Sequence, residues 1–369
     1  MPRFSRRSFL HLSAAASAAA VLRVMNEPML AASHRRAPHS KDAVIIDSNE
    51  NPLGPSQSAR DAMAAIIPLG GRYADDLTDE LVNTFAEMEG LNPDSVYCTA
   101  GSTPPLSLSV LAFTSPQKSY VTADPCFETG MHMAAVAGAR VVKVPLTKTY
   151  AHDIKAMLAA DPEAGLFYIC NPNNPTGTLT SHADIEYLVA NKPKDSVVLI
   201  DEAYIHLSET PAALDLVKAG KDVIVLRTFS KVYGMAGLRC GFVIARPDLL
   251  EKVISRGGQN FMPATAVAAA LASLKDPDLV PQRRRINAGV RQQTFQWLAQ
   301  NGYSFIPSES NCFMVDTKRP GKEVRDAMVK ENVFIGRTWP IMPTYVRITV
   351  GTQDEMTRFQ SAFQKVMKG

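Results

Sequence analysis

Residues 224–241 read Ile-Val-Leu-Arg-Thr-Phe-Ser-Lys-Val-Tyr-Gly-Met-Ala-Gly-Leu-Arg-Cys-Gly, and the rest of the chain can be interpreted around them. An apolar run typical of a buried strand leads into small hydroxyls, Lys231, a glycine-rich turn and Arg239. Hydroxyls and an arginine suit a phosphate group, and a lysine can form a Schiff base with an aldehyde. The segment therefore fits a phosphorylated carbonyl compound. Taken alone, an exposed Lys/Arg loop is the simpler interpretation, so matching residues are needed elsewhere.

Length and composition predict a globular enzyme with one large and one smaller domain. The chain has 369 residues, of which 46% are hydrophobic and 20% charged, as in an ordinary soluble protein. A formal net charge of +3 is too small to indicate a nucleic-acid or anionic-membrane partner. The five cysteines are widely spaced, and their odd number excludes a complete disulfide framework. No spacing indicates a metal site.

The first residues differ in kind from the rest. Residues 5–10, Ser-Arg-Arg-Ser-Phe-Leu, form a twin-arginine motif, and a short stretch rich in Ala and Ser follows. We expect residues 1–32 to be a Tat signal peptide, recognised by the Tat export machinery, which directs the protein to the periplasm. The stretch is too short for a stable membrane anchor. A basic N-terminus without this role, in a cytoplasmic protein, is the alternative.

From residue 33 the sequence predicts three parts. Residues 33–60 should form an N-terminal arm, residues 61–260 a large α/β domain, and residues 261–369 a smaller α+β domain. Short apolar runs that alternate with helical segments predict a mostly parallel sheet between helices. The predicted strands of the large domain cover residues 96–99, 119–122, 141–144, 164–170, 197–200, 223–226 and 241–244.

Polar residues follow several of these strands directly. They occupy Thr99–Thr103, Asn171–Gly177, Asp201–Tyr204 and Thr228–Lys231. The carboxyl ends of parallel strands meet at one edge of the sheet, where sites of α/β proteins lie. The glycine turn at Gly101 also opens a helix, whose free N–H groups suit a phosphate. We therefore expect one site built from all four segments.

Individual side chains indicate what that site holds. Asp201 directly follows an apolar strand and needs a partner. A protonated pyridine nitrogen would be such a partner for the carboxylate. The alternative is that Asp201 caps a helix. Tyr204 and Asn174 could hydrogen-bond the phenolate oxygen of such a ring, and Phe127 could stack on it or lie in the core. Arg347 interrupts a strand pattern and could clamp a carboxylate in bidentate fashion, unless it is an exposed edge arginine.

Five motifs in order resemble the fold-type I pyridoxal-phosphate (PLP) dependent aminotransferases of class I/II, and most closely their histidinol-phosphate aminotransferase branch. The resemblance covers residues 44–369, including Asn-Glu-Asn-Pro near the start. The motifs are Asn-Pro-Thr-Gly (174–177), Asp-Glu-Ala-Tyr (201–204), Thr-Phe-Ser-Lys (228–231), Gly-Leu-Arg-Cys-Gly (237–241) and Val-Arg-Ile-Thr-Val-Gly (346–351).

The resemblance implies a role for each matching residue in a homodimer. Lys231 would form the Schiff base and later move a proton, for which its pKa must be lowered. Asp201 and Tyr204 would complete the catalytic set. The cofactor would be bound by Ser102, Thr103, Phe127, Asn174, Asp201, Tyr204, Thr228, Ser230, Lys231 and Arg239, with Tyr73 from the neighbouring subunit. The substrate would be bound by Arg347, Asn51 and Arg337.

The implied reaction transfers an amino group from histidinol phosphate or an aromatic amino acid to a 2-oxo acid such as 2-oxoglutarate. A PLP-dependent lyase or decarboxylase on the same fold is the alternative, and a non-catalytic PLP-binding module is a third possibility. The residues between Arg337 and Arg347, Thr-Trp-Pro-Ile-Met-Pro-Thr-Tyr-Val, are mainly apolar and suit an aromatic or aliphatic side chain as well as an imidazole. The family is therefore better defined than the substrate.

Overall fold

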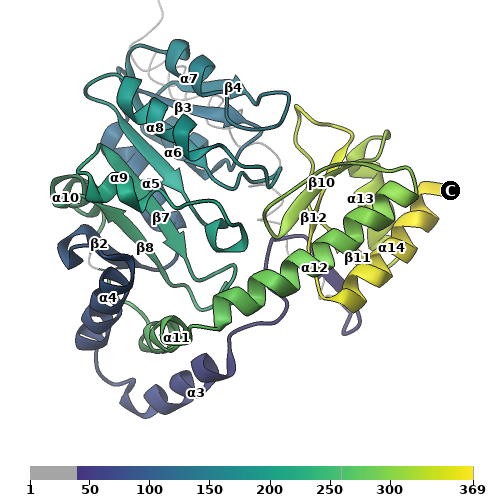
Figure 1. Ribbon diagram of the computed structural model, residues 1–369, viewed down its shortest axis with the longest axis horizontal. Helices are drawn as coiled ribbons and strands as arrows, with labels where there is room; N and C mark the ends of the chain where they lie inside the picture. The colour runs from purple at the N-terminus through teal and green to yellow at the C-terminus, as the bar shows by residue number, and fades with distance from the viewer. Residues whose placement is uncertain (1–39, 259, 369) are drawn as a thin grey trace, which may run out of the picture.

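The computed structural model describes residues 40–258 and 260–368. A large α/β part and a smaller α+β part lie side by side, joined along the long helix α12 (Leu279–Gln300) (Figure 1). The predicted signal peptide, residues 1–32, lies outside the described residues, as does the start of the predicted arm.

A seven-stranded sheet forms the centre of the large part. Its strand order is β2-β8-β7-β6-β5-β3-β4, and β8 alone runs antiparallel to both of its neighbours. All residues of β5, β6 and β7 are buried, as expected of apolar strands covered on both faces. The strands are β2 (Val96–Thr99), β3 (Ser119–Asp124), β4 (Val141–Pro145), β5 (Ala164–Cys170), β6 (Val197–Asp201), β7 (Val223–Thr228) and β8 (Gly241–Ala245).

Helices cover both faces of this sheet, which confirms the predicted α/β class. One face carries α5 (Thr103–Phe113), α6 (Thr129–Val136) and α10 (Pro247–Ile254). The other carries α4 (Asp75–Glu89), α7 (Ile154–Ala160), α8 (His182–Asn191), α9 (Leu214–Lys218) and α11 (Ala264–Leu274). The sequence patterns did not predict α7, α9 and α10, which have seven, five and eight residues.

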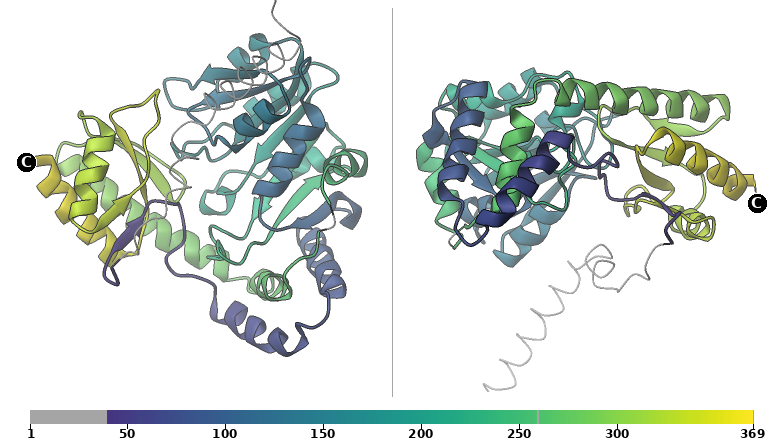
Figure 2. Two further views of the ribbon diagram at one scale, coloured as in Figure 1. Left: turned by 180° about the vertical axis from the view of Figure 1, so that it is seen from behind. Right: turned by 90° about the horizontal axis from the view of Figure 1, so that it is seen from below.

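The smaller part has its own core. Its antiparallel sheet has the order β12-β10-β9, and the first strand of the chain, β1 (Val44–Ile46), pairs in parallel with β11 (Val333–Ile335). The arm is therefore tied to the smaller part before it crosses to the large one (Figure 2). The remaining elements are β9 (Ser304–Ile306), β10 (Cys312–Asp316), α13 (Gly321–Lys330), β12 (Tyr345–Thr349) and α14 (Gln353–Lys368).

The boundary expected at residue 260 differs from the observed packing. Helix α11 lies beyond that boundary, yet it packs against α3 (Gln57–Ile66) and α4 in the core of the large part. Its sequence, ATAVAAALASL, has no polar face to expose to water, so the helix is covered on most sides. The change from one part to the other instead occurs along α12, which contacts the short helix Ile205–Leu207 of the large part and β9 and α14 of the smaller one.

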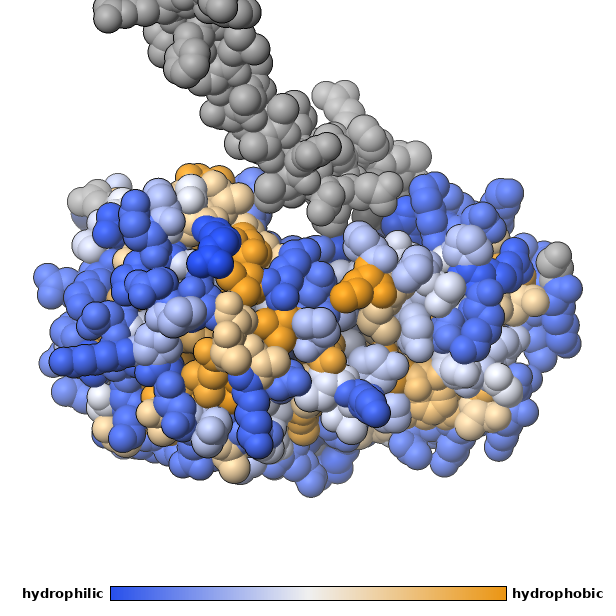
Figure 3. Space-filling view, turned by 90° about the horizontal axis from the view of Figure 1, so that it is seen from above, coloured by the Kyte–Doolittle hydropathy of each residue, from blue (hydrophilic) through white to orange (hydrophobic). Residues whose placement is uncertain are grey.

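The surface seen in Figure 3 is mainly hydrophilic, with apolar side chains in small groups. Within residues 40–258 and 260–368, no helix is both long and apolar enough to cross a membrane.

Candidate active site

The predicted polar segments meet at one edge of the large sheet, next to the smaller part. Asp201 ends β6, Thr228 ends β7, and Asn174 follows β5 by four residues. All three side chains are buried, with at most 5% of each residue exposed. Because β5, β6 and β7 are parallel neighbours, their carboxyl ends bring the three residues together.

Lys231 lies in the turn after β7. Its Nζ donates a hydrogen bond of 2.9 Å to the backbone oxygen of Asn49 and lies 5.3 Å from the centre of the Tyr204 ring. Burial, together with the nearby positive charge of Arg347, lowers the pKa of Lys231 to about 8. The amine can therefore be neutral close to physiological pH, as its expected role requires.

Asp201 is held as a buried carboxylate between two neutral donors. The Tyr168 hydroxyl donates to Oδ2 at 2.9 Å, and the backbone N–H of Ala203 donates to Oδ1 at 3.1 Å. Burial raises the pKa of Asp201 to about 6, because a charged carboxylate is costly away from water. A protonated ring nitrogen placed here would relieve that cost, so this residue fits a pyridinium partner.

Two hydroxyl groups and one guanidinium group form a hydrogen-bonded cluster beside the start of α5. The Nη1 atom of Arg239 is 3.3 Å from Ser230 Oγ, and Ser230 Oγ is 2.9 Å from Thr228 Oγ1. Gly101 has a φ of +87°, and a Cβ atom there would lie 3.0 Å from Cζ of Arg239 and overlap its Nη2. Glycine therefore lets the guanidinium group approach the helix start.

The amide groups of that helix start are suited to an anion. Ser102 is the N-cap residue of α5 and its side chain makes no capping bond, while Thr103 begins the helix. The next two residues, Pro104 and Pro105, have no N–H. Arg239 thus lies between the turn before this helix and the hydroxyls of Ser230 and Thr228, and N–H groups, hydroxyls and an arginine are the donor set that a phosphate monoester requires.

Two hydrogen bonds connect Tyr204 and Asn174, the residues expected to contact the phenolate oxygen of the cofactor, to the smaller part. Asn49 Nδ2 donates to the Tyr204 hydroxyl at 3.0 Å, and Arg347 Nη1 donates to Asn174 Oδ1 at 2.9 Å. Burial raises the pKa of Tyr204 above its usual range, so this phenol stays protonated. The predicted residues Tyr204, Asn174 and Arg347 therefore lie at one place.

Asn49 was not among the sequence predictions, although it lies in the same motif as Asn51. Its backbone N–H and side-chain Oδ1 bind Thr349 Oγ1, and its φ is +54°. Asn51 instead donates to the backbone oxygen of Val232 at 3.0 Å and lines a cavity of about 190 Å³ beside Lys231. Spacing within the motif could not separate these roles, because the turn at Asn49 decides which asparagine contacts Tyr204.

Arg347 is central in β12 and is only 8% exposed. Its Nη2 donates 2.6 Å to the backbone oxygen of Asp47, and its buried Nε makes no hydrogen bond within the described structure. The alternative of an exposed edge arginine does not apply. Each terminal nitrogen carries a second hydrogen, so the group can still bind a carboxylate.

Arg337 follows β11 and forms an ion pair with Glu128, the N-cap residue of α6 in the large part. Its Cζ lies 3.9 Å from the centre of the Trp339 ring, and Cζ of Arg347 lies 5.6 Å from the same ring. The two substrate arginines predicted from the sequence are therefore neighbours, and one is already paired.

Two predicted residues, Phe127 and Tyr73, have none of their described contacts with the other predicted site residues. Phe127 is half-buried against the core cluster on the α6 face of the sheet. Tyr73 is 74% exposed and stacks on Phe261, with ring centres 4.6 Å apart. Its place on the surface does not bring it into the site of its own chain.

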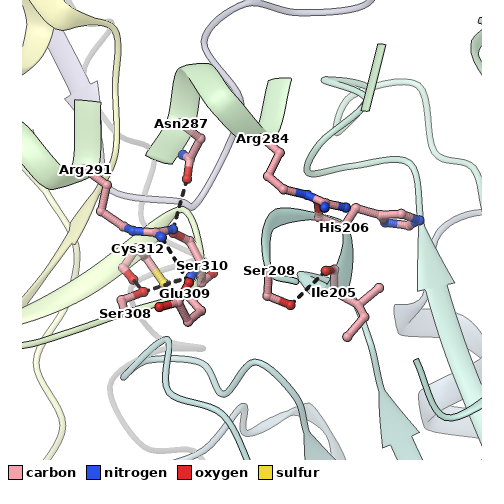
Figure 4. Close-up of polar contacts among 10 residues, drawn as sticks. All are labelled: Ile205, His206, Ser208, Arg284, Asn287, Arg291, Ser308, Glu309, Ser310 and Cys312. Carbon is pink, nitrogen blue, oxygen red and sulfur yellow. Dashed lines mark hydrogen bonds and ion pairs between the residues drawn. The ribbon is translucent and has the colours of Figure 1, made fainter. Parts of the chain in front are cut away.

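Helix α12 does not contribute a predicted site residue, but its arginines bind the segment after Tyr204 and the segment before β10 (Figure 4). Arg284 Nε donates 2.8 Å to the backbone oxygen of His206, two residues after Tyr204. Arg291 Nη1 donates 2.8 Å to the backbone oxygen of Ser310, just before β10. One helix thus links the segment after Tyr204 to the strand that pairs with β12.

Known proteins are similar to this chain in sequence. The family model for aminotransferases of class I and II matches residues 41–363. A histidinol-phosphate aminotransferase from Moorella thermoacetica is 33% identical over 335 residues, which are 89% of this chain and 86% of that protein. An aromatic amino acid aminotransferase from Cutibacterium acnes is 32% identical over 337 residues, 90% and 95% of the two chains.

A solved structure gives the same result. Histidinol-phosphate aminotransferase from Sinorhizobium meliloti, in complex with pyridoxal-5'-phosphate, superposes with a TM-score of 0.82 at 26% identity, covering 93% of this chain and 98% of that one. The fold and site thus define a PLP-dependent aminotransferase of fold type I. The chain belongs to the class I and II aminotransferase family. The predictions of fold, cofactor and reaction class are confirmed.

Proposed function

We propose that Lys231, Asp201 and Tyr204 form the catalytic centre of this aminotransferase, and that it transfers the amino group of an aromatic amino acid or of histidinol phosphate to a 2-oxo acid. The observation that carries this proposal is the position of Lys231 Nζ, which lies beside the Tyr204 ring and donates to the backbone of Asn49 at the entry of the smaller part. Relatives named for both kinds of donor support the substrate class.

The residues divide between two ends of the cofactor. Thr228, Ser230 and Arg239, with the amides of Ser102 and Thr103, would hold the phosphate. Asp201 would hold the ring nitrogen. Tyr204 and Asn174 would face the ring oxygen, and Phe127 would lie near the ring face. When bound, PLP supplies an electron sink for charge that develops at the substrate α-carbon.

The chain itself supplies binding and proton transfer. Arg347 would orient an amino-acid donor, or the 2-oxo acid, through its carboxylate, and Asn174 holds the guanidinium group in place. Lys231, once released, would act in its neutral form as the base that takes a proton from the substrate α-carbon, and it would return that proton to the former aldehyde carbon of the cofactor, on the other side of the imine nitrogen. Its pKa of about 8 suits both steps, because neither protonation state is rare at neutral pH.

An experiment separates this function from its main alternative. Purified protein with PLP is incubated with single amino donors and 2-oxoglutarate, and keto acid, amine and carbon dioxide are measured. We expect glutamate together with the 2-oxo acid of an aromatic amino acid or the ketone of histidinol phosphate, and no activity in Lys231→Ala, whose lysine-dependent absorbance band should also be missing. Amine or carbon dioxide as the main product would establish the lyase or decarboxylase alternative instead.

We further propose that the protein acts as a homodimer in which Tyr73 completes the partner's site. The exposed Tyr73–Phe261 stack, together with Ile67 and Leu69, which are 64% and 62% exposed, supports an interface at this surface. Mixing inactive Lys231→Ala and Tyr73→Ala variants should restore activity, because a hybrid dimer contains one intact site. No recovery after mixing under conditions of subunit exchange would contradict it.

We also propose export by the Tat pathway, on the basis of the motif at residues 5–10. Fractionation should find the wild-type protein in the periplasm and an Arg6→Lys/Arg7→Lys variant in the cytoplasm. Equal distribution of the two would show that the motif is not used, as in the cytoplasmic alternative.

A further inference from the structure

Glu128 and Arg337 connect the two parts of the molecule next to the substrate arginine. Glu128 precedes α6 in the large part, and Arg337 follows β11 in the smaller one. They form an ion pair, and the side chains are 29% and 25% exposed. The pair is therefore partly shielded from water, where an ion pair is stronger than at a fully exposed surface.

The pair neutralises one of two adjacent cations. The backbone N–H of Arg347 binds the backbone oxygen of Arg337, and both guanidinium groups lie over the Trp339 ring. Burial lowers the pKa of Arg337, and the charge of Arg347 adds to this effect, whereas Glu128 opposes it. Two unpaired arginines this close would form a strong subsite for a dianion, so the pairing of Arg337 changes what the subsite prefers.

The two classes of donor carry different anions. An α-amino acid presents a carboxylate with one negative charge, which one guanidinium group can bind in bidentate fashion. A phosphate monoester such as histidinol phosphate carries close to two negative charges at neutral pH and gains from a second guanidinium group. Arg347 alone suits the carboxylate, and a phosphate would have to compete with Glu128 for Arg337.

We propose that Glu128 is a specificity-determining residue: by holding Arg337 it leaves only Arg347, of these two neighbouring arginines, to bind the anion of the donor, so the site selects α-amino carboxylates over phosphate-bearing amines. This inference rests on the proposed function, and it narrows the donor to an aromatic amino acid. It assigns the choice of donor to a residue of the large part, outside the apolar segment between Arg337 and Arg347.

Equilibrium binding tests this proposal without turnover. The probes are 3-phenylpropionate and 2-phenylethyl phosphate, which carry the two anions but no amine, added to the PLP-loaded protein. We expect Glu128→Gln, which frees Arg337 without changing the shape of the side chain, to tighten 2-phenylethyl phosphate binding about fivefold or more, since a partly shielded ion pair contributes roughly 1 kcal/mol. Binding of 3-phenylpropionate should change less than twofold.

Two further variants decide the cause. In Glu128→Gln/Arg337→Gln the gain in phosphate affinity should disappear, because it depends on the freed guanidinium group. Glu331→Gln is the matched control: Glu331 pairs with Lys365 at a similar 27% exposure, away from the site, and its loss should leave both affinities unchanged. A gain that persists in the double variant, or equal changes for both probes, would overturn the proposal.

Kinetics then distinguish this inference from the proposed function. The donor half-reaction of L-phenylalanine and of histidinol phosphate is followed in wild type and Glu128→Gln through the absorbance of the lysine-bound cofactor. The ratio of kcat/KM for the two donors should shift toward histidinol phosphate in the variant. An unchanged ratio with both donors active would refute the role of Glu128 alone, whereas a wild-type protein inactive with every donor would refute the proposed function.

Discussion

Replacing Gly101 with alanine should detach the phosphate end of the cofactor while leaving the fold in place. The residue sits at the start of α5 with a φ of +87°, and the new methyl group would occupy the space of the Arg239 guanidinium group. The left-handed backbone costs an alanine about 1 kcal/mol, which lowers the stability of the protein. Moving Arg239 costs more, because a charge-assisted hydrogen bond contributes about 1.5–3 kcal/mol.

The second cost acts on cofactor affinity. We expect the Kd of PLP to rise roughly ten- to a hundredfold in Gly101→Ala, as measured by absorbance titration of the cofactor-free protein. Activity at saturating PLP should recover largely, because Lys231 and Asp201 are not displaced.

Gly237→Ala is the matched control in the same segment as Arg239. Gly237 is exposed, and an added Cβ would meet no atom within 4 Å. Its Kd for PLP should equal that of the wild type. A Kd for Gly101→Ala within twofold of the wild-type value would show that Arg239 does not bind the phosphate, or that it does so from another position.

Three other substitutions test the site. Because the folded pKa of Asp201 is raised to about 6, its carboxylate destabilises the cofactor-free protein above that pH. Asp201→Asn should therefore unfold at a higher temperature than the wild type at pH 7.5, and at the same temperature near pH 4. Its aminotransferase activity should be lost. A lower melting temperature of the variant at pH 7.5 would contradict this reasoning. Because the folded pKa of Lys231 is lowered to about 8, the native state gives up a proton earlier than the unfolded chain, so wild-type stability should rise between about pH 8 and 10. Denaturant titrations of cofactor-free Lys231→Met should lack that rise. Arg347→Lys keeps the charge but loses the bidentate fork, so kcat/KM for an α-amino carboxylate should fall about tenfold or more, and an unchanged KM would exclude carboxylate binding there.

The strand-end motifs predicted most of the site because parallel strands converge at one edge. Asp201 and Thr228 end neighbouring strands, so their proximity follows once the strands are recognised. Asn49 escaped prediction since its importance depends on contacts with Tyr204 and Thr349, 155 and 300 residues away in sequence. The pairing of Glu128 with Arg337 spans 209 residues and likewise has no local pattern.

The position of the domain boundary likewise depends on contacts between distant segments and not on a local pattern. An all-apolar helix such as α11 can be buried against any core, and only packing on α3 and α4 assigned it to the large part.

By itself, the sequence determined the α/β class, the family and the cofactor, because these depend on periodicity and on motifs that are local in the chain. Only the tertiary structure decided which asparagine faces Tyr204, that Arg347 is buried, and that Arg337 is paired with Glu128. Those outcomes depend on burial and charge between distant segments, and the interaction of two charges is set by their distance in space and the water between them.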